Sequence, residues 1–362
     1  MLEFNLNGFS GYGVQYSPFF DSKIAVVSGA NYGLSGQGKL SILNLTGNRQ
    51  MQESASVITN DCLFDLAWSE INPTQVLVAQ GDGTLTLFDL TNKLQQIQIY
   101  KEHYSEVFSC NWNMLTRRTF ISGSWDGKVK IWDCARSESV LTLRNNRSLG
   151  HTGEHIETKA LQRNSKNKDC IYQALFSPHD PNMAMCCSGN SYLTFFDLRQ
   201  PNQQNSILAH SGLETLSCDY NKYRSYIVAS AGVDKAIRIW DLRMIKNKPH
   251  NMFADISSYN CTNEVVNAHE LAIRKILWSP HHSNYFLTTS YDLTCRVWQD
   301  LSHDGTRQVW KTNSTEPGKG CRYKFNKHTE FVLGADWSLW GQPGFVASTA
   351  WDGKVFIWNA FE

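Results

Sequence analysis

The sequence lacks the features of a secreted or membrane-spanning protein. No apolar run approaches the roughly 18 residues that a transmembrane helix requires. The first residues, MLEFNLNGFSGYG, contain neither the basic nor the apolar segment of a signal peptide. The ten cysteines include no CxxC pair, and adjacent Cys186 and Cys187 are poorly spaced to share a metal ion. We therefore expect a reduced, cytoplasmic protein whose cysteines are mostly small apolar core residues.

The sequence also has almost no excess of charge of either sign. Its 34 basic and 33 acidic residues leave a formal net charge of +1, whereas nucleic-acid-binding proteins usually carry a basic surplus. Hydrophobic residues make up 41% of the 362 positions, with 12 tryptophans, which is enough for a large packed core. We therefore expect no nucleic-acid partner and no extended disorder.

An internal repeat is the strongest signal in the sequence. Four segments align with little freedom: 103–133, 210–241, 269–298 and 328–358. In each of them a His precedes an Asp by 23 or 24 residues, a hydroxyl residue lies four before that Asp, and a Trp follows it by six. The alternating run after the Asp, with Val129 and Ile131 as an example, is typical of a strand with one buried face.

This spacing predicts a buried hydrogen-bonded tetrad in each repeat. The His can bond the Asp, and the hydroxyl can bond both the His and the Trp indole, so that the polar groups satisfy one another. The predicted tetrads are His103/Ser122/Asp126/Trp132, His210/Ser230/Asp234/Trp240, His269/Thr288/Asp292/Trp298 and His328/Ser348/Asp352/Trp358. These residues resemble the WD-repeat family, which implies an all-β propeller with four antiparallel strands per blade around a central channel.

Three weaker repeats complete seven blades in one domain, residues 1–362. One of them keeps Asp82 but has Val78 at the hydroxyl position, and another has Asn190 in place of the Asp. The expected blades are 9–45, 61–90, 103–133, 170–198, 210–241, 269–299 and 328–359, and the strand 2–6 joins the last blade to close the ring. We interpret 134–169, 243–268 and 300–327 as polar insertion loops, the first of them mobile.

Three near matches to catalytic or metal sites favour structural interpretations. Residues 33–40 have the spacing of a phosphate-binding loop, but Leu40 occupies the magnesium-binding position and a strand follows, which favours a hairpin loop. His281 and His282 belong to a turn phrase that recurs in three blades. The tetrads resemble catalytic triads, but an enzyme needs one such site and this chain has four. We therefore expect no enzyme activity, no cofactor and no metal.

The turns that carry the tetrad His and Asp should open on one face, here called the top face. The residues preceding the inner strands provide an acidic set: Asp61, Glu106, Asp169, Glu214 and Glu330. Aromatic residues precede the turn Asp or begin the inner strands: Trp125, Tyr291, Trp351, Tyr12, Phe64, Phe108 and Tyr172. Each could be an ordinary blade residue. Together they predict a site for a short basic amphipathic peptide with leucine-type anchors.

Several strings go beyond the general WD pattern: GFSGYGVQYSPFF, DCLFDLAW, VAQGDGTL, EVFSCNW, GLE with the later CDYNKYR, AHELAIRKILWSPHHSN, KTNSTE, FVLGADWSLWG and VASTAWDG. They closely resemble the peroxisomal import receptors for the N-terminal, type 2 targeting signal, in their fungal form. The resemblance runs from Leu2 to Trp358, and its departures fall mainly within 134–169 and 243–268.

The resemblance implies a function in peroxisome biogenesis and protein transport. Such receptors bind an amphipathic helix of the form Arg-Leu-x5-His-Leu on matrix proteins such as thiolase, together with a co-receptor peroxin. They dock on peroxins at the peroxisomal membrane and cycle between the cytosol and the peroxisome. Asp61 and Glu106 match acidic positions proposed in the family to face the basic residues of the signal. The assignment of Glu214, Trp125, Tyr291 and Trp351 to the same groove is our inference from repeat geometry.

A different class of function stays open at this point. Arg199 follows Phe196-Asp197-Leu198, and Arg243 follows Trp240-Asp241-Leu242. Both match the Trp-Asp-x-Arg element of WD proteins that recruit substrates to cullin-type ubiquitin ligases. Such an Arg also commonly pairs with a neighbouring blade. A scaffold without a defined peptide ligand is a third possibility.

Overall fold

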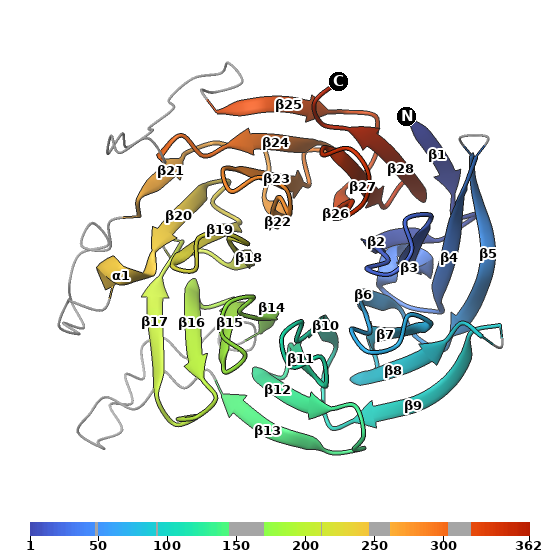
Figure 1. Cartoon of the computed structure of the whole chain (residues 1–362), viewed down its shortest axis with the longest axis horizontal. Coiled ribbons are helices and arrows are strands. Elements are labelled where there is room, and N and C mark those ends of the chain that lie inside the picture. Colours follow the sequence, from blue (N-terminus) through green and yellow to red (C-terminus); the bar gives the residue numbers. More distant parts are fainter. Residues whose placement is uncertain (48–49, 92, 145–169, 211, 246–260, 303–319) are drawn as a thin grey trace.

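The computed structural model of the chain describes residues 1–47, 50–91, 93–144, 170–210, 212–245, 261–302 and 320–362. These residues form seven four-stranded antiparallel sheets. The sheets are arranged around a central axis as the blades of a propeller, with β2, β6, β10, β14, β18, β22 and β26 innermost (Figure 1). The predicted seven-bladed WD-repeat propeller is confirmed.

The first four blades run in chain order from the inner to the outer strand. Blade 1 contains β2 (Ser10–Tyr16), β3 (Lys23–Gly29), β4 (Gly38–Thr46) and β5 (Gln50–Thr59), with the 3-10 turn η1 (Ala30–Gly33). Blade 2 contains β6 (Leu63–Trp68), β7 (Gln75–Gln80), β8 (Thr84–Asp89) and β9 (Gln95–Lys101). Blade 3 contains β10 (Val107–Trp112), β11 (Thr119–Ser124), β12 (Lys128–Asp133) and β13 (Ser139–Arg144). Blade 4 contains β14 (Ile171–Phe176), β15 (Met183–Ser188), β16 (Tyr192–Asp197) and β17 (Gln204–Leu208).

The last three blades include the strand that closes the ring. Blade 5 contains β18 (Thr215–Tyr220), β19 (Ile227–Gly232), β20 (Ile237–Asp241) and β21 (Asn263–Val265), with the short helix α1 (Leu242–Ile245). Blade 6 contains β22 (Ile273–Trp278), β23 (Tyr285–Ser290), β24 (Cys295–Gln299) and β25 (Cys321–Phe325). Blade 7 contains β26 (Val332–Trp337), β27 (Phe345–Ala350), β28 (Lys354–Asn359) and, from the other end of the chain, β1 (Leu2–Asn5).

The closure of the ring by the N-terminal strand is confirmed. Strand β1 pairs antiparallel with β28, with Leu2 opposite Ile357 and Phe4 opposite Val355. The two strands lie side by side at the rim (Figure 1). Leu6 follows β1 and is buried in a core cluster with Val355 and Ile357. Sequence-distant segments thus share one apolar core, which removes two exposed sheet edges.

The expected insertion loops were drawn too wide. The range 134–169 contains β13, 243–268 contains part of α1 and β21, and 300–327 contains β25. These outermost strands pack on one side only, so each contributes few buried residues to the sequence pattern; Leu143 is the one fully buried residue of β13. The expected ranges of the first six blades missed the outer strands for the same reason. Residues 145–169, 246–260 and 303–319, which include most of the segment 134–169 that was expected to be mobile, lie outside the described residues.

All four tetrads are hydrogen-bonded as their spacing predicts. In blade 3, His103 Nδ1 lies 2.9 Å from Asp126 Oδ2, His103 Nε2 lies 2.8 Å from Ser122 Oγ, and the Trp132 indole donates to Ser122 at 2.9 Å. In the other three blades the His also bonds its Asp, at 2.8 to 3.0 Å. Their hydroxyls bond the His at 2.7 to 2.9 Å and accept the indole N–H at 2.8 to 3.1 Å: Ser230 with His210 and Trp240, Thr288 with His269 and Trp298, and Ser348 with His328 and Trp358.

Burial keeps the hydroxyl and indole groups of the tetrads away from any ligand. Ser230, Thr288 and Ser348 have no exposed surface, and Trp298 is only 2% exposed. Enclosed side chains such as these cannot contact a bound peptide, so none of the four belongs to a binding surface. Their hydrogen bonds stabilise the blade interior, where an unpaired hydroxyl or indole N–H would be costly.

The blades without a tetrad have lost the donor and the acceptor together. The strand register places Val26, Val78 and Cys186 at the position of Ser122. At the position of Trp132, the same blades have Leu43, Phe88 and Phe196. Replacing both partners of a buried hydrogen bond by apolar groups costs little, whereas replacing one leaves the other unsatisfied. The paired substitutions explain why these blades persist without the repeat signature.

Adjacent blades are joined through polar side chains of the inner strands. Each accepts a backbone N–H from the next inner strand: Asp65 from Cys110 at 3.1 Å, Ser109 from Ala174 at 3.0 Å, Gln173 from Cys218 at 3.1 Å, Ser217 from Ile276 at 3.0 Å and Asp336 from Tyr16 at 2.9 Å. The Asp336 bond joins blade 7 to blade 1. Burial raises the pKa of Asp336 to about 6, despite this hydrogen bond and the nearby charge of Lys275.

The substitution Trp132→Phe should destabilise the fold because it leaves the Ser122 hydroxyl without the indole donor. We expect a loss of about 1–3 kcal/mol in the free energy of unfolding, measured by urea denaturation. In a Ser122→Ala background the same substitution should cost less, since the acceptor is already gone. Equal costs in both backgrounds would show that the indole hydrogen bond contributes nothing.

The substitution Asp336→Asn should stabilise the protein increasingly as pH rises. The pKa of Asp336 in the folded chain, about 6, lies above its unfolded value of 3.8, so the wild type loses stability as this carboxylate ionises. The asparagine keeps an acceptor for Tyr16 and cannot ionise. Urea denaturation should show the variant gaining about 1–3 kcal/mol over wild type between pH 4 and 7.

Asp219 provides the matched control for this pH dependence. It occupies the equivalent position in blade 5, but Lys222 lies 2.8 Å away as a counter-ion. Asp219→Asn should therefore destabilise the protein rather than stabilise it. A stability difference between wild type and Asp336→Asn that does not change with pH would contradict the role assigned to burial.

Candidate functional site at the channel mouth

A β-bulge in every inner strand shapes the mouth of the central channel. The register shifts after the first paired residue of the inner strand in six blades and after the second in blade 1, which leaves one residue unpaired in each blade. The seven bulge residues are Tyr12, Phe64, Phe108, Tyr172, Leu216, Arg274 and Leu333. Bulges redirect side chains locally. Six of these seven residues line one cavity of about 20 Å³, enough for roughly one water molecule, at the channel mouth.

The predicted aromatic residues form one continuous band around this mouth. Phe108 stacks on Phe64 at 4.7 Å and on Trp125 at 4.9 Å between ring centroids, and Tyr172 lies 5.9 Å from Phe108. Tyr12 continues the band, 5.2 Å from Phe64 and 6.1 Å from Trp351.

Two members of the band were missed at the level of sequence. Phe331 connects Trp351, at 5.2 Å, with Tyr291, at 5.0 Å. Tyr32, in η1, packs 5.4 Å from Trp351, and its carbonyl accepts the Tyr12 hydroxyl at 2.5 Å. Phe331 directly precedes inner strand β26, the position that Glu106 occupies before β10, so correct alignment of the repeats could have found it. Nothing in the repeat pattern points to Tyr32.

Among the aromatic side chains that contact Phe108, that of Trp125 is the most exposed. Its side chain is 37% exposed, whereas Tyr12 and Phe64 are 8% and 9% exposed. Its backbone N–H donates to the carbonyl of Glu106 at 3.0 Å, which ties an exposed aromatic residue to an acidic one. Tryptophan beside a carboxylate is a suitable combination for binding a peptide that is both apolar and cationic.

The predicted acidic set occupies two different registers. Glu106 and Glu214 directly precede their inner strands, whereas Asp61 and Glu330 lie one residue earlier. The four carboxylates therefore lie at two neighbouring repeat positions rather than at one. Asp169, the fifth member, lies outside the described residues.

The described acidic residues carry negative charge without cationic partners. Asp61 accepts the N–H of Cys62 at 2.7 Å, and Glu106 accepts the Ser105 hydroxyl. Glu214 accepts the Tyr172 hydroxyl, and burial together with this carboxylate raises the pKa of Tyr172. Within the described part of the chain, no ion pair is formed by Asp61, Glu106, Glu214 or Glu330. Their charge is therefore available to a ligand.

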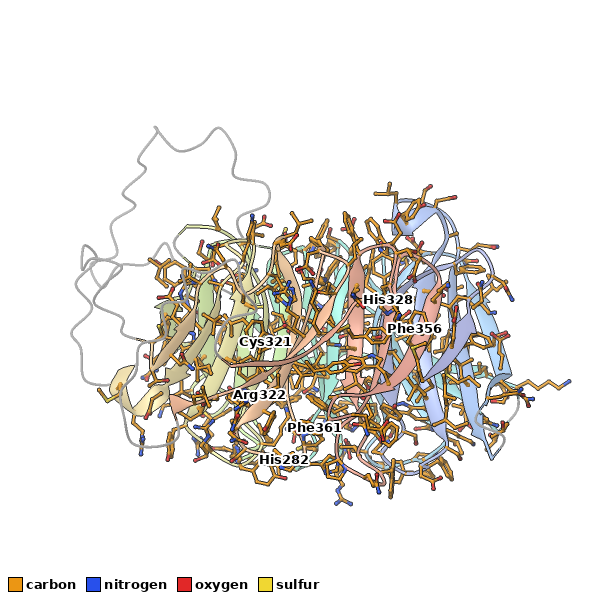
Figure 2. The ribbon with its side chains drawn as sticks, turned by 90° about the horizontal axis from the view of Figure 1, so that it is seen from above. His282, Cys321, Arg322, His328, Phe356 and Phe361 are labelled. Carbon is orange, nitrogen blue, oxygen red and sulfur yellow. The ribbon has the colours of Figure 1, made fainter. Side chains whose placement is uncertain are left out.

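The remaining candidate residues have structural partners. Lys39 forms an ion pair with Glu53 at 2.7 Å and lies in β4, so residues 33–40 form a hairpin loop rather than a phosphate-binding loop. His281 donates from Nε2 to the carbonyl of Ser338 at 2.9 Å, which joins blades 6 and 7. His282 lies toward the face opposite His328 (Figure 2).

Among the described residues, Arg199 and Arg243 form ion pairs only with carboxylates of their own blades. Arg243 forms an ion pair with Asp241 at 2.6 Å and covers the Tyr226 ring at 3.5 Å. Arg199 forms an ion pair with Asp197 at 2.8 Å.

A larger hollow lies on the outer wall, away from the channel mouth. Its volume is about 600 Å³, and Arg322 and Phe361 line it (Figure 2). None of the predicted binding residues that the structure describes lines it. Among the described residues, no group of three His, Cys, Asp or Glu side chains is placed to hold a metal ion. No helix in the described ranges has the length and apolar character needed to cross a bilayer.

Comparisons with known proteins agree with this architecture. The family described as WD domain, G-beta repeat matches residues 94–133, 202–241, 260–299 and 319–359. These matches cover the four blades with tetrads, and together with the seven sheets they define the chain as a WD-repeat β-propeller.

Several relatives share a more specific name. The peroxisomal targeting signal 2 receptor of Saccharomyces cerevisiae is 55% identical over 373 residues, covering 99% of each chain. That of Komagataella phaffii is 44% identical over 99% of each chain, and that of Homo sapiens is 30% identical over 90% of this chain and 85% of the human one. The chain belongs to the family of peroxisomal targeting signal 2 receptors.

Proposed function

We propose that this protein is an import receptor that binds type 2 peroxisomal targeting signals on its top face. The ligand is an N-terminal amphipathic helix of the form Arg-Leu-x5-His-Leu on matrix proteins such as thiolase. A co-receptor binds with it, and docking peroxins receive the complex at the peroxisomal membrane. The receptor cycles between the cytosol and the peroxisome. The names of the relatives support the general role in peroxisomal import.

The observation that carries the proposal is the aromatic band beside carboxylates without ion pairs. An amphipathic helix presents leucine side chains on one stripe and cationic side chains next to it. The leucines can pack on the rings of Trp125 and Phe108, while the Arg and His reach Glu106, Asp61 and Glu214. Such a surface binds by burial and charge, with no reaction, so the function requires no enzyme activity.

The rival role is that of a ubiquitin-ligase adaptor, which would bind its partner through Arg199 and Arg243. Each pairs with a carboxylate of its own blade, and their side chains are 58% and 63% exposed. A pull-down through Arg243 that captures a cullin-ligase adaptor would support this role, and capture of the signal peptide alone would exclude it.

The substitution Glu106→Lys should abolish signal binding because it places a cation where the ligand presents one. We expect at least about thirtyfold weaker affinity, corresponding to about 2 kcal/mol, in fluorescence anisotropy with a labelled Arg-Leu-x5-His-Leu peptide. Thermal unfolding should change little. Glu138→Lys makes the same charge change at an exposed turn between β12 and β13, and it should bind normally. Unaltered affinity of Glu106→Lys would refute the assignment.

The substitution Trp125→Ala should weaken peptide binding about 10- to 100-fold, since exposed tryptophans are frequent binding hot spots. Trp340→Ala is a matched control, because Trp340 is 36% exposed, close to the 37% of Trp125, and follows β26 in a turn at the other end of the inner strands. The same anisotropy titration should show wild-type affinity for the control. Equal losses in both variants would indicate a general effect on folding rather than a binding role for Trp125.

A further inference from the structure

Arg274 interrupts the apolar ring at the channel mouth. All seven bulge positions are described, and the other six carry Tyr12, Phe64, Phe108, Tyr172, Leu216 and Leu333. In each of the other six blades, the residue at this position is aromatic or aliphatic. A cation there has no role in forming the blade, because the six uncharged equivalents fold the same way.

The guanidinium of Arg274 reaches across the channel mouth. Its Cζ lies 5.1 Å from the ring centroid of Phe108. Arg274 is in β22 and Phe108 is in β10, strands on opposite sides of the ring (Figure 1). Arg274 also lines the same cavity as Tyr12 and Tyr172, and its charge acts on both hydroxyls. A positive charge therefore lies at the centre of the aromatic band.

This guanidinium has donors without acceptors. Among the described residues, Arg274 forms no ion pair and no hydrogen bond, and its partner is the face of the Phe108 ring. An arginine presents five N–H donors, and its charge interacts strongly where water is scarce. Arg274 can therefore bind an acceptor group of a ligand lying over the mouth, and it repels a cationic group placed there.

We propose that Arg274 is a specificity-determining residue that excludes cationic side chains from the part of the signal helix lying over the channel. This inference rests on the proposed function. Repulsion at the centre and attraction by Glu106 and Glu214 near the rim act together. They fix the rotation of the helix, so that its Arg and His face the acidic residues while uncharged or acidic residues cover the mouth.

Helix geometry identifies the residue of the signal peptide that lies next to Arg274. At about 100° per residue, the third of the five variable residues lies roughly 40° from the leading Arg and 40–60° from the two leucines. It is therefore in the middle of the binding face. The first variable residue lies on the opposite side of the helix, about 160° from the third. Arg274 should discriminate charge at the third position and not at the first.

The test pairs charge changes in the peptide with charge changes in the receptor. Four peptides carry Lys or Glu at the third or the first variable position, and each is titrated by anisotropy against wild type, Arg274→Glu and Arg274→Gln. The matched control is Arg322→Glu, an exposed arginine on the outer wall (Figure 2). Wild type and the control should bind the third-position Lys peptide at least about tenfold more weakly than the Glu peptide.

Arg274→Glu should reverse this order, and Arg274→Gln should reduce the difference. The first-position pair should bind equally to every receptor. If Arg274→Glu does not fold, the result with Arg274→Gln alone decides the matter. An unchanged order of third-position peptides in the Arg274 variants would overturn the inference and leave the proposed function intact. Failure of wild type to bind the unmodified signal peptide would overturn both.

Discussion

The pairing of β1 with β28 holds the ring closed, and the geometry of the channel mouth depends on that closure. Seven blades meet around one axis. Polar side chains such as Asp65, Gln173 and Asp336 bond five of the inner strands to the next one, and the indoles of Trp68 and Trp337 bond carbonyls across the other two junctions. These contacts fix the position of every blade only when the ring of blades is closed. The first residues of the chain complete it by filling the outer position of the last blade, where Leu6 is buried.

Closure places seven bulge residues at one level around the axis and so creates the site. Most of their side chains are apolar, and with Trp125, Trp351 and Phe331 they make a continuous aromatic surface. Carboxylates near the rim add negative charge to this surface, and one arginine at the centre adds positive charge. Apolar area supplies affinity for many ligands, whereas this charge pattern restricts which amphipathic helix fits and in which rotation. The fold contributes rigidity, and a few side chains contribute selectivity.

Much of this architecture could be predicted from the sequence because the tetrads repeat at fixed spacing. The partnership of His103 with Asp126 and Ser122 follows from chemistry that leaves few alternatives for buried polar groups. The outer strands β13, β21 and β25 could not be delimited, since one exposed face weakens their hydrophobic pattern. The inner aromatics Phe64, Phe108 and Tyr172 are the second residues of their strands and Tyr12 is the third, so the strand pattern alone points to their place at the channel mouth. Asp61 and Glu330 lie one residue further from their strands than Glu106 and Glu214. Arg274 lies four residues before Trp278, as Phe108 lies four before Trp112, so the spacing shows their equivalence; it escaped notice because the prediction considered only aromatic residues at this position.

The central claim is that a signal helix lies across the aromatic band of the top face, and a structure of the complex tests it most directly. The protein would be crystallised or imaged with an Arg-Leu-x5-His-Leu peptide and its co-receptor. The account predicts leucine side chains of the peptide against Trp125 and Phe108, and its cationic residues beside Glu106. A helix bound at the outer wall or on the opposite face, near His282, would contradict it.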